Sequence, residues 1–186
     1  WEIKVPEEIL ALPKEEYKKR WTTPETRHHL LLMAEAQNRD YCVSVGNQAA
    51  VLYGFAADYD GILTDDLIES VQKKPQSRYC PAWWSKSQSG KLHLFWFFER
   101  PIAVAGNAHA NQLLRIVARK IKAAKWAVGY DPSCENVTQV MDIGYDWHVF
   151  RENSFIPSEE LVLWDFAIFE AGAKGVSQDV VSIPFD

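Results

Sequence analysis

An apolar run that ends in two aspartates constrains the fold of this 186-residue chain more than any other feature. The run 51–57 has the length and composition of a buried strand, and Asp58-Tyr59-Asp60-Gly61 follows it directly. Successive side chains of a strand point to opposite faces, so Asp58 and Asp60 are expected to lie side by side. Two convergent carboxylates favour a Mg²⁺ or Mn²⁺ site, because hard cations prefer oxygen ligands. The alternative is a strand-end turn, with both aspartates solvated and the chain reversing at Gly61.

The composition indicates a folded domain with a substantial core. Hydrophobic residues make up 47% of the sequence and aromatic residues 13%, and the length suits one domain, or one domain with a small appendage. No apolar stretch is long enough to span a membrane, and the charged start, Trp1-Glu2-Ile3-Lys4, is unlike a secretory signal. Because the chain does not begin with methionine, we expect a domain excised from a longer protein.

Net charge and cysteine content narrow the function classes. A net charge of −5 and a pI of about 5.6 count against a large non-specific nucleic-acid surface, which is normally basic. They leave open a local basic groove or a phosphate ligand bridged by a metal ion. The three cysteines are widely spaced and have no metal-binding spacing, which suits a reducing compartment, so we expect a cytoplasmic protein with no membrane partner.

Helical and strand signals alternate along the chain, which predicts an α/β or α+β fold. Helical segments are expected at 7–10, 14–20, 23–38, 63–74, 107–128 and 159–171. Besides the strand that ends at Asp60, strands are expected at 41–46, 92–98, 137–143 and 146–150. Thr23 is expected to cap the third helix, and Pro101 to end the strand 92–98. The chain therefore divides into an N-terminal helical segment that packs on the core (1–40), a main domain (41–171) and a C-terminal tail or linker (172–186).

A polar loop before the most apolar strand is the second candidate site. Ser87-Gln88-Ser89-Gly90 leads into Lys91-Leu92-His93, and Lys91 and His93 share one face of the expected strand. Two hydroxyls, an ammonium and an imidazole favour an oxyanion ligand, most naturally phosphate. The loop opens into a strand and so fits a Walker loop poorly, since that loop opens into a helix. The alternative is a hairpin turn followed by a buried structural histidine.

Asp131 is the third candidate. It follows the long expected helix in Gly129-Tyr130-Asp131-Pro132, where a carboxylate could close a three-carboxylate metal cluster. The alternative is a turn that ends the helix, for which glycine, aspartate and proline are ordinary choices.

The order of these motifs resembles the catalytic core of the archaeo-eukaryotic primase superfamily, in particular the primase-polymerase (prim-pol) domains of plasmid, phage and other mobile-element replication proteins. That family is described by an hhhDhD strand, an sxH strand and a later hD position. These correspond here to 54–60, 89–93 and Tyr130-Asp131, and 140–144 looks like the family's strand that ends in a glycine turn. The chain departs from the pattern at Gln139 and Met141, where related prim-pols frequently have arginines.

The resemblance implies a prim-pol core with an RNA-recognition-motif-like, mainly antiparallel sheet flanked by helices, and a catalytic domain at 41–171. It implies a DNA primase or polymerase that uses two divalent metals, Mg²⁺ or Mn²⁺, to transfer nucleotides from NTP or dNTP onto a strand templated by single-stranded DNA. The implied metal ligands and catalytic residues are Asp58, Asp60 and Asp131. The implied nucleotide-binding residues are His93, Lys91, Ser89, Ser87 and Lys86. A fused or separate helicase is the implied protein partner.

Two groups of side chains are candidates for contact with the template. A basic helix face could follow template phosphates or could be an ordinary solvated surface; it comprises Arg115, Arg119, Lys122 and Lys125. Four tryptophans could form a base-stacking platform for single-stranded template or could pack in the core: Trp83, Trp84, Trp96 and Trp147.

Other functions stay open beside the polymerase. One is a replication-initiator DNA-binding module that keeps the prim-pol shape without synthesis, and another is a nucleotide-binding regulatory domain. A metal-dependent nuclease of the relaxase type would normally have a paired-histidine strand, whereas Leu92-His93-Leu94 offers a single histidine.

Overall fold

The computed structural model of the chain describes residues 4–26, 32–33, 36, 49–63, 65, 69, 79–123, 129–139, 144–152 and 154–173. Several expected elements lie wholly or mostly outside these residues: the strand 41–46, the helix 63–74 and the tail 172–186. The same holds for 140–143 and for the end of the helix expected to reach 128. In the described part of the expected strand 137–143, residues 137–139 form a turn and irregular structure instead.

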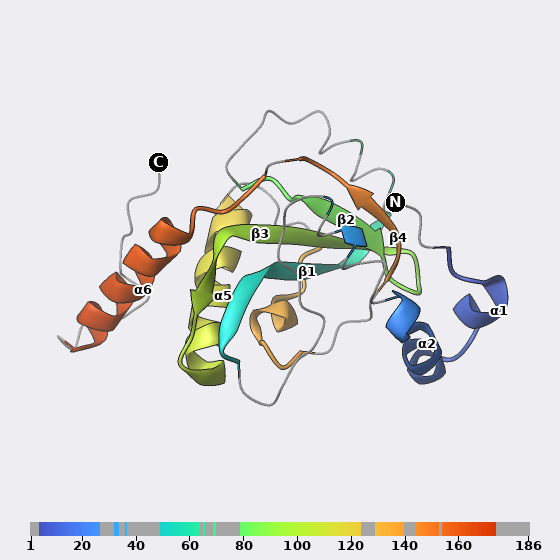
Figure 1. Cartoon of the computed structure of the whole chain (residues 1–186), viewed down its shortest axis with the longest axis horizontal. Helices are drawn as coiled ribbons and strands as arrows, with labels where there is room; N and C mark the ends of the chain where they lie inside the picture. Colours follow the sequence, from blue (N-terminus) through green and yellow to red (C-terminus); the bar gives the residue numbers. More distant parts are fainter. Residues whose placement is uncertain are drawn as a thin grey trace.

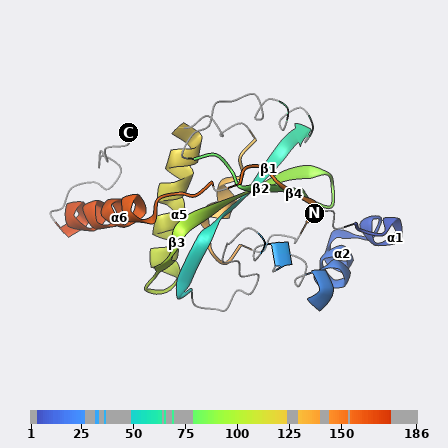
Figure 2. The ribbon, with the colours of Figure 1, turned by 45° about the horizontal axis from the view of Figure 1, so that its top comes forward.

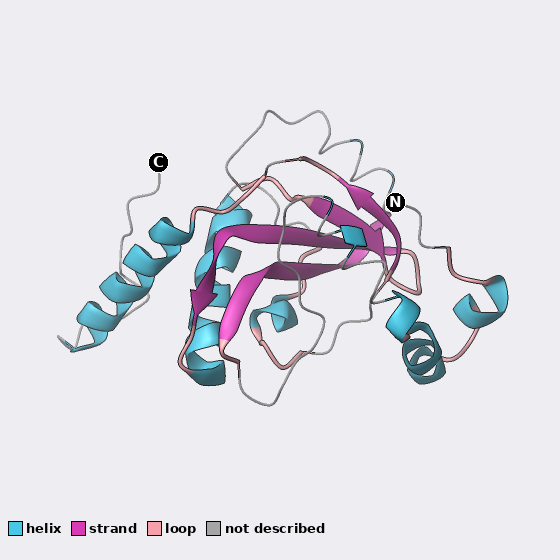
Figure 3. Ribbon diagram, viewed as in Figure 1, coloured by secondary structure: helices cyan, strands magenta, loops and turns pink. Residues whose placement is uncertain are grey.

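A four-stranded antiparallel sheet flanked by helices forms the described part of the chain, which confirms the α+β prediction (Figures 1 and 3). The strands lie in the order β1-β3-β2-β4. Their bounds are Val51–Leu63 for β1, Trp83–Lys86 for β2, Lys91–Ala103 for β3 and Tyr145–Val149 for β4. The helices are α1 (Glu7–Leu10), α2 (Lys14–Trp21), α5 (Gly106–Ala123) and α6 (Ser158–Ala173), with the short 3₁₀ helix η1 at Pro132–Glu135.

The two faces of the sheet carry separate cores. One face packs against α5 and α6 through a cluster that includes Phe55, Ala57, Tyr59, Leu94, Trp96, Leu113, Val117 and Trp164. The other face packs against the N-terminal segment through Tyr17, Trp21, Met33, Trp83, Phe95, Phe97 and Trp147. The helices are also separated along the sheet: α5 and α6 lie toward one end, and α1 and α2 lie toward the other (Figure 2). The alternation of side chains along the strands therefore decides which residues face the N-terminal segment.

Two boundaries of the central strands differ from the sequence expectation. β1 continues past Gly61 to Leu63, so the chain does not reverse at Gly61 and the turn interpretation of the aspartate pair is wrong. β3 continues past Pro101 to Ala103, so the expectation that Pro101 ends the strand is also wrong. Pro101 is tolerated because it lies in the irregular stretch between the paired residues Phe97 and Ile102, where no ladder hydrogen bond is required of it.

The N-terminal segment is held on the sheet by specific contacts. Tyr17 and Trp21, one helical turn apart on α2, are 0% and 7% exposed, and Trp21 Nε1 donates a hydrogen bond to Gly144 O at 2.6 Å. After α2, Thr23 caps the next helical turn as expected, since Thr26 N donates to Thr23 Oγ1 at 3.2 Å. The contact between the 1–40 segment and the sheet face thus involves both apolar burial and a long-range hydrogen bond.

Gly54 is expected to be one of the residues most sensitive to substitution. A Cβ placed on Gly54 would lie 2.1 Å from Trp96 O and 3.1 Å from Phe97 Cα, which are backbone atoms of the neighbouring strand. Gly54→Ala is therefore expected to lower the free energy of unfolding by more than about 2 kcal/mol, measured by urea denaturation. The control is Gly90→Ala, because a Cβ there meets nothing within 4 Å and only the positive φ of 80° opposes it. An equal loss in the two variants would contradict the steric explanation.

Candidate metal and nucleotide site

A short backbone bridge brings Asp131 beside the aspartate pair of β1. Tyr59 and Tyr130 form an antiparallel bridge, in which Asp60 N donates to Gly129 O at 2.7 Å and Asp131 N donates to Asp58 O at 2.9 Å. In such a bridge Asp131 lies opposite Asp58, and both side chains point away from the two tyrosines. Two segments about seventy residues apart in the sequence therefore present Asp58, Asp60 and Asp131 to the same side.

The strand register places His93 next to the first aspartate. Asp58 on β1 pairs with His93 on β3, and His93 Nε2 lies 3.3 Å from Asp58 Oδ1. His93 is 2% exposed, and its Nδ1 has no hydrogen-bond partner among the described residues. Burial raises the pKa of Asp58, but the neighbouring His93, the Tyr59 backbone and Lys91 outweigh it and hold the pKa below its usual value. Asp58 is therefore an anionic group that forms part of the same site as the buried imidazole.

The loop between β2 and β3 is a tight hairpin that holds two hydroxyls at the site. Gly90 has a φ of 80°, Gly90 N donates to Ser87 O at 2.8 Å, and Ser87 Oγ lies 3.2 Å from Ser89 Oγ. Lys91 follows the turn, and its Nζ forms an ion pair with Asp60 Oδ1 at 2.8 Å. This ion pair raises the pKa of Lys91. The hairpin interpretation of the backbone is thus correct, and the loop also carries the polar groups expected to bind phosphate.

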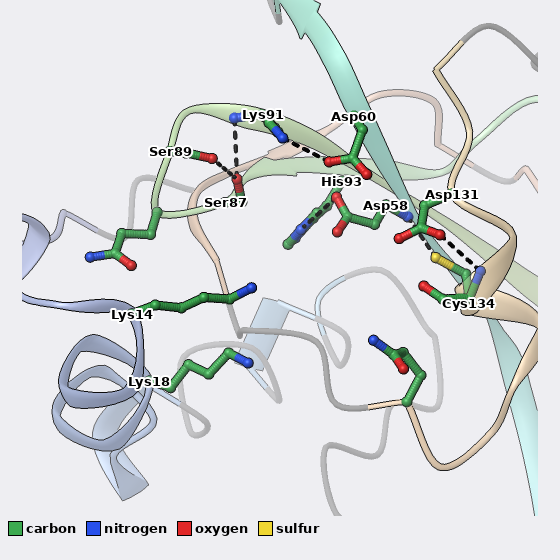
Figure 4. Close-up of a pocket in the computed structure, with 13 residues that line it drawn as sticks. Lys14, Lys18, Asp58, Asp60, Ser87, Ser89, Lys91, His93, Asp131 and Cys134 are labelled. Carbon is green, nitrogen blue, oxygen red and sulfur yellow. Dashed lines mark hydrogen bonds and ion pairs between the residues drawn. The ribbon is translucent and has the colours of Figure 1, made fainter.

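These residues line one pocket of about 430 Å³ (Figure 4). Of the eight residues expected from the sequence, the pocket contains seven: Asp58, Asp60, Ser87, Ser89, Lys91, His93 and Asp131. The other lining residues were not assigned a role from the sequence; they are Lys14, Lys18, Gln88, Ser133, Cys134 and Gln139. In Figure 4, Lys14 and Lys18 extend from α2 toward the side on which the carboxylates lie.

The donor chemistry of the pocket fits a divalent cation. Three carboxylates are hard oxygen donors, and Asp58 Oδ1 is buried without a well-aligned hydrogen bond from any described residue. Within the described residues, however, no three His, Cys, Asp or Glu side chains are grouped closely enough to bind one ion. In the structure Asp60 is paired with Lys91, and Asp131 Oδ1 accepts a hydrogen bond from Ser133 N at 2.9 Å. Side-chain rotation of Asp60 and Asp131 would be needed for the three carboxylates to share an ion.

Cys134 supports the base of the pocket. It lies in η1, is 6% exposed, and its Sγ accepts a hydrogen bond from Asp58 N at 3.0 Å. Burial, reinforced by the charges of Asp58 and Asp131 and opposed by hydrogen bonds from the backbone, raises the pKa of the thiol to about 12. The neutral thiol therefore links η1 to β1, and this contact was not predictable from the sequence because it depends on the tertiary fold.

Lys86 is not part of the pocket. Its Nζ lies 3.3 Å from Asp146 Oδ2, and Asp146 Oδ1 in turn lies 2.7 Å from His148 Nε2. Side chains alternate along β2, so Lys86 points to the face opposite Ser85. The structure thus separates Lys86 from the other nucleotide-binding candidates.

Asp146 gives an expected pH dependence of stability. Burial raises its pKa, but His148 and Lys86 outweigh burial, so the pKa lies below the ordinary value of 3.8. A group with a lowered folded-state pKa stabilises the fold above its unfolded pKa and loses this contribution as the pH falls through the folded pKa. On acidification past pH 3.8, wild type is therefore expected to lose more free energy of unfolding than Asp146→Asn, which still tolerates the positive φ of 57°. Parallel pH–stability curves for the two proteins would contradict this.

The aromatic and basic candidates for template contact lie mostly elsewhere. Trp83, Trp96 and Trp147 are 0%, 2% and 1% exposed, so the core interpretation is confirmed for them and the base-stacking one is wrong. The half-buried Trp84 stacks on His148 with ring centroids 4.2 Å apart. On α5, Lys122 Nζ lies 3.0 Å from Glu135 Oε1, and the helix packs on the face of the sheet opposite the pocket. The fourth basic candidate, Lys125, lies outside the described residues.

No protein-family model, curated protein or solved structure matches the chain. Among the described residues, none of the helices has the length and apolar character needed to cross a membrane.

Proposed function

We propose that the chain is a primase-polymerase domain that transfers nucleotides from nucleoside triphosphates onto a strand templated by single-stranded DNA. One observation carries the proposal: the Tyr59–Tyr130 bridge joins Asp131 to Asp58 and Asp60, in the same pocket as His93. The order of the motifs predicts that Asp131 lies beside Asp58 and Asp60, although the segments are far apart in the sequence. A distant Asp131 would have removed the basis for a three-carboxylate site. The proposal also implies cytoplasmic replication of DNA and a helicase as fused or separate partner.

The residues of the pocket divide into two functional groups. Asp58, Asp60 and Asp131 would hold two divalent cations, Mg²⁺ or Mn²⁺. When bound, such ions activate an attacking hydroxyl and stabilise a pyrophosphate leaving group. The carboxylates are suited to this because Asp58 is held anionic by His93 and because backbone hydrogen bonds fix the position of Asp131 relative to Asp58.

The second group would bind the triphosphate. His93 is fixed by the strand pairing, and its Nε2 faces the carboxylate side of the pocket. Ser87 and Ser89 offer hydroxyls from a hairpin whose turn is already formed. Lys91 neutralises Asp60 in the present arrangement, and a cation at Asp60 would release its ammonium group for a phosphate oxygen. These groups act by positioning and by charge, because phosphoryl chemistry leaves little covalent work to the protein.

The Lys91–Asp60 ion pair also favours a second candidate function, a nucleotide-binding regulatory domain. An ammonium group 2.8 Å from a carboxylate neutralises it without a metal, so the pocket could bind a triphosphate and stop there. This candidate predicts nucleotide binding with no incorporation.

Incorporation of labelled nucleotides on single-stranded DNA tests the proposal. Reactions with and without a primer contain either the four NTPs or the four dNTPs, and Mg²⁺ or Mn²⁺. Template-dependent products that disappear with a chelator are expected. Nucleotide binding without products would favour the regulatory domain, and oligonucleotide binding without products would favour the replication-initiator module.

A further inference from the structure

We infer that Lys14 and Lys18 of α2 bind the polyphosphate of the incoming nucleotide, from the side of the pocket opposite the three carboxylates. This inference rests on the proposed function and adds a role for the N-terminal segment, which none of the sequence motifs includes. Both side chains line the pocket, and both extend toward the carboxylates from the opposite side (Figure 4).

The helix that carries the lysines is fixed in place. Tyr17 and Trp21 are buried against the sheet, and Trp21 Nε1 donates to Gly144 O. Gln88 of the β2–β3 hairpin donates from its Nε2 to Leu10 O at 3.0 Å and also to Leu12 O, just before α2 begins. The segment before α2 is thus tied to the same hairpin that supplies Ser87 and Ser89. The hydrogen bonds of Gln88 therefore hold α2 and the β2–β3 hairpin in a fixed relation on the two sides of the pocket.

The spacing of the lysines suits one extended anion. Residues four apart on a helix lie one turn apart on the same face, so Lys14 and Lys18 present two ammonium groups side by side. Lys14 is exposed and Lys18 is half-buried, so neither ammonium must be removed from a closed core to reach a ligand. A chain of phosphates can contact both ammonium groups at once.

Lys14 and Lys18 also differ from the other charged residues of the pocket in their ion pairing. Lys91 is already paired with Asp60, and His93 is directed at Asp58. The side chains of Lys14 and Lys18 form no ion pair or hydrogen bond with any described residue, although three carboxylates line the same pocket. The described lining thus contains three ammonium groups and three carboxylates, and it becomes strongly positive once divalent cations bind. That charge suits a polyanion held between the ions and α2.

A nucleoside triphosphate fits this position better than a nucleic-acid backbone. The lysines line the same pocket as the candidate metal ligands, so a polyphosphate that contacts the lysines can extend to the candidate metal site. In nucleotidyl transfer the phosphates bound at the metals belong to the incoming nucleotide. Template phosphates spaced along a strand would instead require cations spread over an open surface.

Titration calorimetry with Mn²⁺ present tests the inference. The probes are a non-hydrolysable α,β-imido deoxynucleoside triphosphate, the corresponding nucleoside and a single-stranded oligonucleotide. Lys14→Ala and Lys18→Ala are each expected to weaken binding of the analogue roughly fivefold, and the double variant roughly tenfold or more. Binding of the nucleoside is expected to stay unchanged, and Lys14→Arg and Lys18→Arg are expected to restore most of the analogue affinity.

The matched control is the double variant Lys19→Ala, Arg20→Ala. It removes two exposed charges from the same helix at positions that do not line the pocket. Far-UV circular dichroism and the thermal midpoint of each variant check that α2 stays docked. A control that loses as much affinity as the lysine variants would overturn the inference, because the overall positive charge of α2 would then account for both losses of affinity.

Three other results also overturn it. If wild type and the Lys14→Ala, Lys18→Ala double variant bind the analogue equally, the inference is wrong while the proposed function stands. If the double variant loses oligonucleotide affinity and keeps analogue affinity, the lysines contact nucleic acid instead. If wild type does not bind the analogue at all, the proposed function and the inference both fail.

Discussion

Asp58→Ala is expected to lower template-dependent incorporation by about a thousandfold or more, because loss of a carboxylate that holds a catalytic cation removes several kcal/mol of transition-state stabilisation. The effect should be large because Asp58 combines three roles in the geometry. It pairs with His93 across the sheet, it lies opposite Asp131, and its Oδ1 is the buried oxygen that lacks an aligned hydrogen bond. Single-turnover incorporation with saturating Mn²⁺ is the measurement, since saturation separates loss of chemistry from weaker metal binding.

The control for this variant is Asp146→Asn. It removes a carboxylate whose pKa is also lowered and which is paired with Lys86 and His148 away from the pocket. Incorporation by this control is expected to stay within about twofold of wild type, since surface changes away from such features have small effects. Asp131→Asn should resemble Asp58→Ala. Activity of Asp58→Ala close to that of wild type would remove the metal assignment, even if the protein proved to be a polymerase.

His93→Gln is expected to have the second largest effect, a rise in the apparent KM for the nucleoside triphosphate of about tenfold to a hundredfold, as expected for loss of a charged hydrogen bond to phosphate. Glutamine keeps a polar group on the strand but not the imidazole beside Asp58. Because His93 is 2% exposed and lies in a very apolar strand, the larger change to alanine would also leave a cavity. Steady-state incorporation at varied triphosphate concentration is the measurement, and urea unfolding checks the fold.

His148→Gln is the matched control for that experiment. His148 also lies beside an aspartate, but it stacks on Trp84 and does not line the pocket. Its substitution is expected to leave the KM for triphosphate unchanged. A normal KM in His93→Gln would remove His93 from the nucleotide site and return it to the structural role of a buried histidine.

Local patterns were sufficient to predict the parts of the fold in which short-range rules decide the outcome. The apolar run before Asp58 predicted a strand, because a buried strand needs continuous apolar side chains. The period of the long helix predicted α5, and Thr23 was identified as a cap from its position before Pro24. The proximity of Asp131 to Asp58 followed only from the order of the motifs, since nothing in the residues around Asp131 specifies its distant partner.

Contacts between distant segments account for what the sequence did not predict. Lys14 and Lys18 belong to the site only because Tyr17 and Trp21 dock α2 on the sheet, and a helix of eight residues carries little indication of where it will dock. Lys86 was expected in the site as part of the polar loop, but it is the last residue of β2 and its side chain points to the other face. Pro101 was expected to end β3, but an irregular stretch in the pairing with β1 accommodates it.

The tyrosine bridge makes the pocket sensitive to residues that never touch a substrate. Tyr59 is 1% exposed and meets Tyr130 edge to face, with ring centroids 6.0 Å apart, while Tyr130 also stacks on Phe55. These rings lie on the α5 side of the sheet, yet the backbone between them sets how far Asp58 stands from Asp131. Mg²⁺ accepts a narrower range of ligand geometry than larger cations do. In the proposed metal site, substitutions among these rings are therefore expected to shift the preference from one divalent ion to another without changing any of the proposed ligands.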